Sequence, residues 1–300
     1  MKSVTIAIPT HNRARDLRDT LSSIVALAIP EGVAVDCIVI DNASSDDTPR
    51  AVEDAAHSAP PFPIRYVFES RQGSSFARNR AVDEAVGDFI VFIDDDATAD
   101  REWLRAILSA LETRGLDAAC GVVLPRWSTP PPPWLGSRLW VKLAVHDRAA
   151  IETATASQIE TLDNYFSANV GFRRDAFERF GRFREDIGVV GNNPMSGEDT
   201  ELFARILAHG GKMGFVRDAI VHHLIGPERM TAEYLRRKSF AFGLGSAIVG
   251  GKSHNRLDKL ARNLMRMSAA AMRGDREGVI YHQLECANFL GYWRGRLTHR

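Results

Sequence analysis

A short apolar run that ends in three carboxylates constrains the possible folds and functions of this chain more than any other sequence feature. Residues Phe89 to Ile93 are all apolar, and Asp94, Asp95 and Asp96 follow without a spacer. Apolar runs of about four to eight residues are typical of buried strands, and ligands bind at the carboxyl ends of strands in open α/β sheets. Adjacent carboxylates repel one another unless a cation compensates them. The run favours a divalent metal site, although an acidic turn explains these residues equally well when they are taken alone.

Signals for strands and helices alternate through the first half of the chain. This alternation predicts a βαβαβαβ pattern, and therefore a mostly parallel sheet with right-handed crossovers. We expect strands over Val4–Ile8, Val35–Ile40, Ile64–Phe68, Phe89–Ile93 and Ala118–Leu124, and helices over Arg15–Leu27, from Asp47, over Ser75–Val86 and over Trp103–Arg114.

A proline-rich stretch from Thr129 to Trp134 interrupts this pattern. Such a stretch does not fit the interior of a helix or sheet, so it marks a boundary or a long surface loop. We expect three parts: residues 1–125, 126–231 and 232–300. Beyond the prolines the sequence predicts an irregular region over Asp147–Asn164, a strand over Ala168–Phe172, helices from Asp175 and over Asp199–His209, a strand over Met213–Val216 and basic helices from Ala232.

The composition is that of an ordinary soluble protein. The 300 residues carry a formal net charge of zero, so no global field attracts nucleic acid. Three widely separated cysteines exclude a disulfide framework and a zinc site built on paired cysteines. Residues Met1 to Pro9 lack the apolar core of a signal peptide, and no segment is apolar over the ~20 residues that a membrane span needs. We expect a cytoplasmic protein with at most peripheral contact with the inner face of the membrane.

Polar residues follow several of the predicted strands. In an open sheet the carboxyl ends of parallel strands lie along one edge, so these residues are expected to converge on one crevice. The segments are Pro9–Arg13, Asp41–Thr48, Arg71–Asn79, Asp94–Asp96 and, further along the chain, Gly197–Asp199.

This combination of motifs resembles the family 2 glycosyltransferases, in particular bacterial enzymes that build surface polysaccharides. The similarity covers roughly residues 4–245, and the combination is more specific than any single motif. It implies the GT-A fold, an α/β fold whose mostly parallel, Rossmann-like sheet is flanked by helices, here with a helical C-terminal extension. It also implies an inverting transfer of sugar from a nucleotide-sugar, most simply a UDP-sugar, to a glycan or a lipid-linked acceptor.

The resemblance assigns a donor-binding role to residues from four segments. A carboxylate at Asp41 would accept the imide N–H of uracil, and arginines would bind phosphate oxygens. An Asx turn at Asp41 and an ion pair at Arg78 are the structural alternatives. The implied donor-binding residues are Pro9, Thr10, Asn12, Arg13, Asp41, Arg71, Arg78, Asn79, Asp94 and Asp95.

The acidic triplet matches the family's Asp-x-Asp pattern at Asp94 and Asp96. The resemblance implies that Asp94 approaches the ribose and metal-bound water, and that Asp96 ligates Mn²⁺ or Mg²⁺ directly. Of the adjacent His222 and His223, which follow a short apolar run, the second fits the spacing of the family's histidine ligand better. Side chains alternate along a strand, so at most one of the two histidines faces the site.

The segment that begins Glu198–Asp199 and ends at Arg205 resembles the family motif that carries the catalytic base. Asp199 would accept the proton of the acceptor hydroxyl, although an aspartate there is also an ordinary helix cap. On the acceptor side the resemblance implies Asn169, Gly171 and Glu198. The tryptophans that flank the prolines, Trp127, Trp134 and Trp140, could stack on a sugar, but packing is the more common role of such residues.

Two other functions fit parts of the pattern. A nucleotidyltransferase also combines an α/β sheet with paired carboxylates, but it would be expected to carry a glycine-rich, lysine-bearing loop where this chain has Pro9–Arg13. A non-catalytic module that binds nucleotide-sugars or glycans could keep the fold without turnover. The presence of Asp96 and Asp199 favours an enzyme.

The C-terminal segment from residue 256 onward combines apolar and basic residues at helical spacing. Its stripe of Leu257, Leu260, Leu264 and Met267, with basic flanks, suits a helix that lies on an anionic membrane. The same stripe could pack on the catalytic domain or on a second copy in an oligomer. We favour packing because Asp258 and Asp275 interrupt the basic character.

Overall fold

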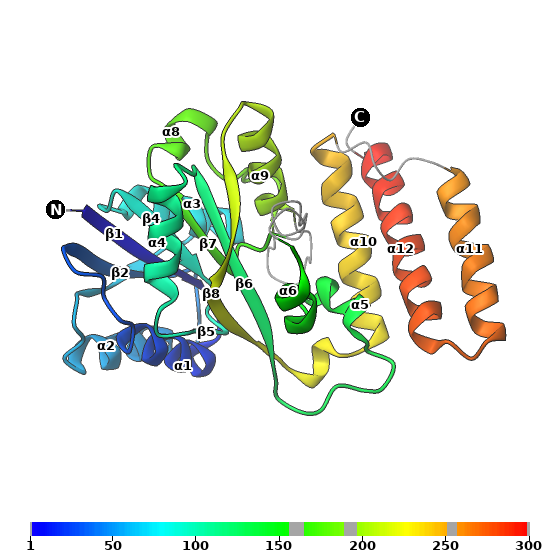
Figure 1. Ribbon diagram of the computed structural model, residues 1–300, viewed down its shortest axis with the longest axis horizontal. Coiled ribbons are helices and arrows are strands. Elements are labelled where there is room, and N and C mark those ends of the chain that lie inside the picture. Colours follow the sequence, from blue (N-terminus) through cyan, green and yellow to red (C-terminus); the bar gives the residue numbers. More distant parts are fainter. Residues whose placement is uncertain (1, 156–164, 189–196, 251–256, 299–300) are drawn as a thin grey trace. The chain divides into compact units, whose positions relative to one another are not determined.

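The computed structural model describes residues 2–155, 165–188, 197–250 and 257–298 (Figure 1). They form two compact units, each built from segments that are separate in the sequence. The first comprises Met1–Pro125, His146–Glu185 and Asp199–Leu224, and the second comprises Arg126–Val145, Asp186–Glu198 and Ile225–Arg300. The division into residues 1–125, 126–231 and 232–300 stays a prediction.

One twisted sheet organises the first unit. Within the described residues it has eight strands in the order β3-β2-β1-β4-β7-β6-β8-β5. The strands are β1 (Lys2–Thr10), β2 (Val33–Asp41), β3 (Ile64–Phe68), β4 (Phe89–Ile93), β5 (Ala97–Ala99), β6 (Ala118–Trp127), β7 (Asn169–Arg173) and β8 (Met213–Ile225).

The expected α/β fold with a largely parallel sheet is confirmed. Strand β1 pairs in parallel with β2 and β4, and β2 pairs in parallel with β3. The later strands depart from this pattern, because β7 runs antiparallel to β4 and β6, and β5 runs antiparallel to β8. All five residues of β4 are buried, as its continuous apolar sequence predicts for a central strand.

Helices cover the sheet, and their apolar spacing explains how they pack. Helix α1 buries Leu17, Leu21 and Ile24, which lie on one face at intervals of three and four residues. The helices of this unit are α1 (Ala14–Val25), α2 (Thr48–His57), α3 (Ser74–Glu84), α4 (Trp103–Thr113), α6 (Arg148–Thr153), α8 (Ala176–Phe180) and α9 (Glu198–Ala208), of which Glu198 is assigned to the second unit.

Two predicted boundaries are wrong. Residues after Asp147 were expected to be irregular, but Asp147 caps α6 by accepting a hydrogen bond from the Ala149 N–H at 3.0 Å. Residues 156–164 of that region lie outside the described residues. The strand expected over Met213–Val216 continues to Ile225, because the pairing of β5 with β8 extends it.

The second unit is mainly helical. It contains α5 (Ser137–Trp140) and the short 3-10 helices η1 (Val141–Leu143) and η2 (Pro227–Arg229). Its three long helices are α10 (Ala232–Ile248), α11 (Leu257–Met272) and α12 (Arg276–Thr298), with α12 between the other two (Figure 1). Glycines allow α10 and α12 to approach closely, since a Cβ at Gly243 or Gly291 would overlap the backbone of the other helix. No described helix combines the length and apolar character that crossing a bilayer requires.

The predicted apolar stripe of α11 is covered only in part. Leu260 and Met267 are half-buried, whereas Leu257 and Leu264 are exposed. Asn263 and Ala270 are the buried residues of this helix, so its packed face is rotated from the one that the leucines predict. Packing of Leu257 and Leu264 on a second copy stays a prediction.

A buried asparagine ties four elements of the first unit together. Asn169 is fully buried at the start of β7, and its Oδ1 accepts a hydrogen bond from Trp103 Nε1 of α4 at 2.8 Å. Its Nδ2 donates to the carbonyl oxygens of Val122 on β6, at 2.9 Å, and Ala219 on β8, at 2.8 Å. These bonds occupy the amide within the sheet. The predicted contact of Asn169 with an acceptor sugar therefore finds no support, and the side chain has a structural role.

We expect Asn169→Ala to destabilise the protein by about 3 kcal/mol or more, because three buried partners each lose a hydrogen bond worth roughly 1–3 kcal/mol when left unsatisfied. Chemical denaturation measures this change. As a control, Thr113→Ala removes an exposed hydrogen bond to the Ser109 carbonyl and should stay within about 0.5 kcal/mol of wild type. Equal stabilities of the Asn169→Ala variant and wild type would contradict the structural role.

Candidate active site

The centre of the site forms where β5, a very short strand, pairs with the long strand β8. The acidic triplet follows β4 directly, and β5 begins at Ala97, immediately after Asp96. In the register of β5 with β8, Ala97 lies opposite His223. The Leu224 N–H also donates to the Asp96 carbonyl oxygen at 2.8 Å. The backbone thus places His223 beside Asp96, although 127 positions separate the two residues in the sequence.

Asp94, Asp96 and His223 form a group with the dimensions of a metal site. One ligand atom from each residue lies within 4.8 Å of the other two. His223 Nε2 is 3.0 Å from Asp96 Oδ1, and both side chains are almost fully buried. Two carboxylates and one imidazole suit Mn²⁺, and the carboxylates alone suit Mg²⁺. The donor set therefore fits the divalent ion that the sequence predicts.

Two arginines compensate the carboxylates. Arg13 Nη1 lies 2.9 Å from Asp95 Oδ1 and 2.7 Å from Asp96 Oδ2, and Arg78 Nη2 lies 3.4 Å from Asp94 Oδ1. Burial raises the pKa of Asp95 to about 6, with Arg13 opposing the rise and Asp96 adding to it. The negative charge of Asp95 in turn raises the pKa of Arg13 further above its usual value. Arg13 thus holds the triplet in the structure, where the sequence suggested only a donor contact.

The two histidines face different partners, as the alternation along a strand predicts. His223 faces Asp96, whereas His222 Nε2 lies 3.0 Å from Asp100 Oδ1. The preference for His223 agrees with this geometry. Both residues lie inside β8, which continues past the short apolar run to Ile225.

A chain of contacts connects Asp199 to the triplet through a residue that the sequence analysis did not single out. Arg78 Nη2 donates to Ser167 Oγ at 3.0 Å, and the Ser167 backbone N–H donates to Asp199 Oδ2 at 3.3 Å. Asp199 Oδ1 accepts a hydrogen bond from the Thr200 N–H at 2.7 Å, so the residue also acts as a helix cap. The feature of the sequence that could have pointed to Ser167 is its position, two residues before β7.

Asp41 lies buried at the end of β2 with both carboxylate oxygens engaged. Its Oδ2 accepts a hydrogen bond from the Tyr66 hydroxyl at 2.7 Å, and its Oδ1 accepts one from the Ser44 N–H at 2.8 Å. Burial and the adjacent Asp41 raise the pKa of Tyr66 above its usual value. A carboxylate offers about four acceptor positions, so Asp41 retains the capacity to bind a further donor. Tyr66 was not predicted from the sequence.

The loop after β1 lies against the loop after β2. Pro9 and Thr10 pair with Ile40 and Asp41 in the sheet. Asn12 has a positive φ of 54°, a conformation that asparagine tolerates better than most residues. Its N–H donates to Ser44 Oγ at 2.9 Å, and its Oδ1 accepts from the Ser45 N–H at 2.7 Å. Asn12 therefore joins two of the segments that were expected to converge.

Two of the predicted donor-binding residues, Arg71 and Asn79, have partners away from the triplet. Glu69 binds Arg71 through both carboxylate oxygens, at 3.0 and 3.1 Å. Asn79 exchanges hydrogen bonds with the backbone of Phe183, at 2.9 and 3.0 Å. Among these described contacts, neither residue is brought to the carboxylates, so their donor-binding roles stay predictions.

The two remaining acceptor-side residues are buried. A Cβ at Gly171 would overlap Ile107 of α4, so this glycine permits the helix to pack on β7. Glu198 is buried at the start of α9, where its Oε2 accepts a hydrogen bond from the Gly197 N–H at 3.0 Å. Their contact with an acceptor also stays a prediction.

Comparison with known proteins identifies the family. The family model described as Glycosyl transferase family 2 matches residues 5–181, which is more than half of the chain. The chain is also 30% identical over 278 residues to the succinoglycan biosynthesis protein ExoM of Rhizobium meliloti, a match that covers 92% of this chain and 82% of that protein. The chain belongs to glycosyltransferase family 2.

Other proteins are similar to this glycosyltransferase in sequence or in fold. The glucosyl-dolichyl phosphate glucuronosyltransferase of Haloferax volcanii is 20% identical over 249 residues, which cover 82% of this chain and 76% of that protein. A structure of a mannosyltransferase from Pyrobaculum calidifontis, in complex with GDP-Man and Mn²⁺, has a TM-score of 0.71 at 19% identity and covers 99% of this chain and 87% of that chain. A structure of S. aureus TarS 1–349 in complex with UDP-GlcNAc has a TM-score of 0.55 at 15% identity and covers 100% of this chain and 92% of that chain. The GT-A fold expected from the sequence is confirmed.

The two histidines offer a matched test of the metal site of this glycosyltransferase. We expect His223→Gln to weaken Mn²⁺ binding about tenfold or more, because it removes one of three ligating side chains. His222→Gln should leave Mn²⁺ binding within about twofold of wild type, since its partner is Asp100. Titration of Mn²⁺ followed by electron paramagnetic resonance measures both. Unchanged binding in His223→Gln, or equal losses in the two variants, would exclude the proposed ligand set.

Proposed function

We propose that this glycosyltransferase moves a sugar from a UDP-sugar to a hydroxyl of a glycan or lipid-linked acceptor, with inversion at the anomeric carbon and dependence on Mn²⁺ or Mg²⁺. The observation that carries the proposal is the convergence of Asp94, Asp96 and His223 at the carboxyl end of β4. The mannosyltransferase of similar fold that was crystallised with GDP-Man and Mn²⁺ supports it. ExoM, named for succinoglycan biosynthesis, supports an acceptor of the polysaccharide type.

The residues of the chain divide the work of the reaction. Asp94, Asp96 and His223 would hold the divalent ion, which supplies positive charge that stabilises a departing nucleoside diphosphate. Arg78, which is almost fully buried, provides further positive charge close to Asp94. Asp41 accepts the imide N–H of the base, with Tyr66 fixing the orientation of its carboxylate.

Asp199 acts as the general base. A sugar hydroxyl is a weak nucleophile, and Asp199 accepts its proton as the oxygen attacks the anomeric carbon. The Ser167 N–H and the Thr200 N–H each bind one oxygen of this carboxylate and so orient it. A single displacement on the face opposite the diphosphate inverts the anomeric centre.

Metal dependence of nucleotide binding tests the donor site. UDP should bind markedly more tightly with Mn²⁺ than with EDTA, because the phosphates and the carboxylates then share one cation. UDP should also bind more tightly than GDP if the base contact of Asp41 is selective. Calorimetry measures both differences. Equal UDP affinity with and without the metal would overturn the metal-dependent part of the proposal.

The role of the base is tested by Asp199→Asn, which keeps the shape of the side chain and removes its proton acceptor. We expect turnover to fall roughly 10²-fold or more while UDP affinity changes little. UDP release from a UDP-sugar chosen by thermal shift measures turnover even before the acceptor is known, because water then replaces the acceptor hydroxyl. The control Asp218→Asn makes the same change at an exposed position of β8. Retained turnover in Asp199→Asn would exclude the role, and lost UDP binding would place Asp199 in the donor site.

A further inference from the structure

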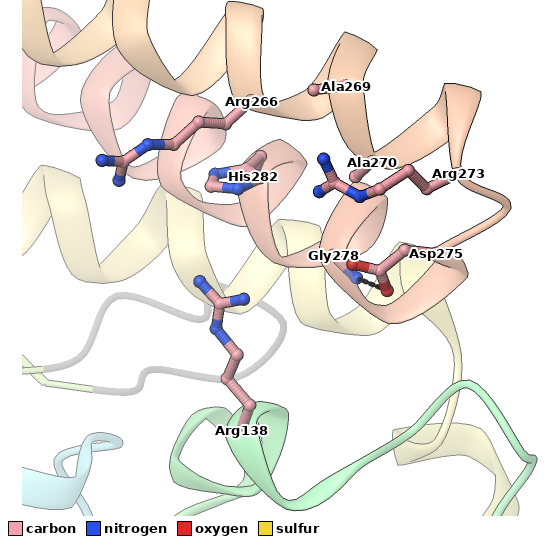
Figure 2. A pocket seen from close by; sticks show the side chains of 8 residues that line it. All are labelled: Arg138, Arg266, Ala269, Ala270, Arg273, Asp275, Gly278 and His282. Atoms are coloured by element: carbon pink, nitrogen blue, oxygen red, sulfur yellow. Dashed lines mark hydrogen bonds between the residues drawn. The ribbon is translucent and has the colours of Figure 1, made fainter.

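The helical unit contains a basic pocket that the proposed transfer reaction does not use. Its volume is about 330 Å³, and it lies among α5, the second half of α11 and the start of α12. Figure 2 shows Arg138 extending from α5 toward the pocket, with Arg266 of α11 and Arg273, which directly follows α11, on either side of His282. All of these residues belong to the second unit.

Within the described part of the chain, the arginines of the pocket differ from other charged residues of this unit in having no carboxylate partner. Glu285 pairs with Lys142 at 3.5 Å and with Lys259 at 3.3 Å, and Arg262 pairs with Asp258 at 2.9 Å. Among the described residues no ion pair is recorded for Arg138, Arg266 or Arg273. Three guanidinium groups thus line one pocket with their hydrogen-bond donors available.

The other polar groups of the pocket do not cancel the charge of its three arginines. Asp275 is the carboxylate in the lining, and its Oδ1 accepts a hydrogen bond from the Gly278 N–H at 2.8 Å, which caps α12. His282 is buried, and its Nδ1 lies 2.9 Å from Asn263 Oδ1. Burial and then the charges of Arg138 and Arg266 lower the pKa of His282. Cations therefore outnumber the carboxylate, and the pocket suits an anion.

Arg138 is held in a way that leaves its donors accessible. Its guanidinium carbon lies 3.5 Å from the centre of the Tyr281 ring. Stacking occupies the flat face of a guanidinium and leaves the N–H groups at its edge free to bind oxygen atoms. One guanidinium group can donate two parallel hydrogen bonds to two oxygens of the same phosphate. A phosphate group is therefore the anion that this arrangement fits best.

An exposed apolar face runs along α11 beside the basic residues. Its large side chains are Leu257, Leu264, Met265 and Met272, which are 70%, 46%, 64% and 83% exposed. Met265 and Met272 directly precede Arg266 and Arg273, and residues seven apart lie on nearly the same face of a helix. The two methionines are therefore direct neighbours of two arginines of the pocket, along and just after α11.

We propose that the pocket binds the phosphate group of a membrane lipid, with the exposed face of α11 in contact with the lipid chains. A helix with basic residues beside exposed Leu and Met side chains suits the boundary between head groups and acyl chains. The phosphate accounts for the arginines, and the chains account for the apolar face. The pocket shares no residue with the proposed donor site, and the proposal does not depend on the transfer reaction.

Vesicle binding tests the proposal. The full-length protein should sediment with phosphatidylcholine vesicles that contain phosphatidic acid at ~150 mM salt, and much less with phosphatidylcholine alone. We expect the double variant Arg266→Gln/Arg273→Gln to bind the vesicles at least about tenfold more weakly than wild type, because each arginine near an anionic surface contributes to binding. UDP binding measured on the same preparations shows that the variants are folded and that the donor site is intact.

A matched control separates the pocket from general charge. Arg262→Gln/Arg276→Gln removes the same number of charges from nearby positions that do not line the pocket, and it should keep vesicle binding within about threefold of wild type. If both double variants lost vesicle binding equally, the attraction would come from overall positive charge, and the proposal that the pocket binds the lipid phosphate would be wrong.

The proposed contact between the exposed face of α11 and the lipid chains has a separate test. Met265→Ser/Met272→Ser should weaken vesicle binding without changing UDP affinity. If inorganic phosphate or diphosphate binds the protein as tightly as the vesicles do, the pocket is a site for a soluble anion and the lipid proposal is wrong. If wild type is a dimer in sedimentation velocity and the methionine variant is a monomer, a second copy covers the face, which also overturns the proposal.

Discussion

The carboxylate of Asp96 is divided between two partners, and the arrangement of the candidate site depends on that division. Its Oδ2 lies 2.7 Å from Arg13 Nη1, and its Oδ1 lies 3.0 Å from His223 Nε2. One oxygen is thereby fixed by an ion pair while the other faces the imidazole with which it could share a metal ion. Since Asp96 is almost fully buried, little water is present to compete for either oxygen. Arg13 thus orients a ligand, whatever contact it makes with a nucleotide.

The sheet explains how residues so distant in the sequence meet. The first strands place Arg13 and the acidic triplet at one edge, as parallel strands with helical crossovers do. The antiparallel strands then bring the remaining groups: β8 brings His223 through its pairing with β5, and Ser167 precedes β7, which pairs with β4. Asn169, at the start of β7, bonds to the backbones of β6 and β8 from inside the sheet, where the order is β7-β6-β8. Its hydrogen bonds therefore help to fix the start of β7, two residues after Ser167, which is itself buried.

The sequence predicted those features that depend on local pattern. Strand and helix positions in the first half follow from the spacing of apolar residues, and the position of Asp41 beside Thr10 follows from the parallel pairing of β2 with β1. The separation of His222 from His223 follows from alternation along a strand. Other features depend on long-range pairing, which a pattern of residue types does not record. Arg13 and Arg71 look alike in the sequence, yet Arg13 reaches the triplet, whereas Glu69 binds Arg71 two residues away. The resemblance implied that Asn169 lies near the acceptor sugar, but it did not indicate that hydrogen bonds to β6 and β8 engage the side chain.

Charge explains why the arginines do not make the metal superfluous. The sequence argument held that three adjacent carboxylates require a cation, and the structure supplies Arg13 and Arg78. Two guanidinium groups still leave three carboxylates with a negative excess when His223 is neutral. A nucleoside diphosphate is itself an anion, so it would approach such a centre against electrostatic repulsion. A divalent ion held by Asp94, Asp96 and His223 would reverse the sign of that excess and turn repulsion into attraction. The arginines stabilise the folded carboxylates, and the proposed metal would make the same carboxylates compatible with a phosphate-bearing donor.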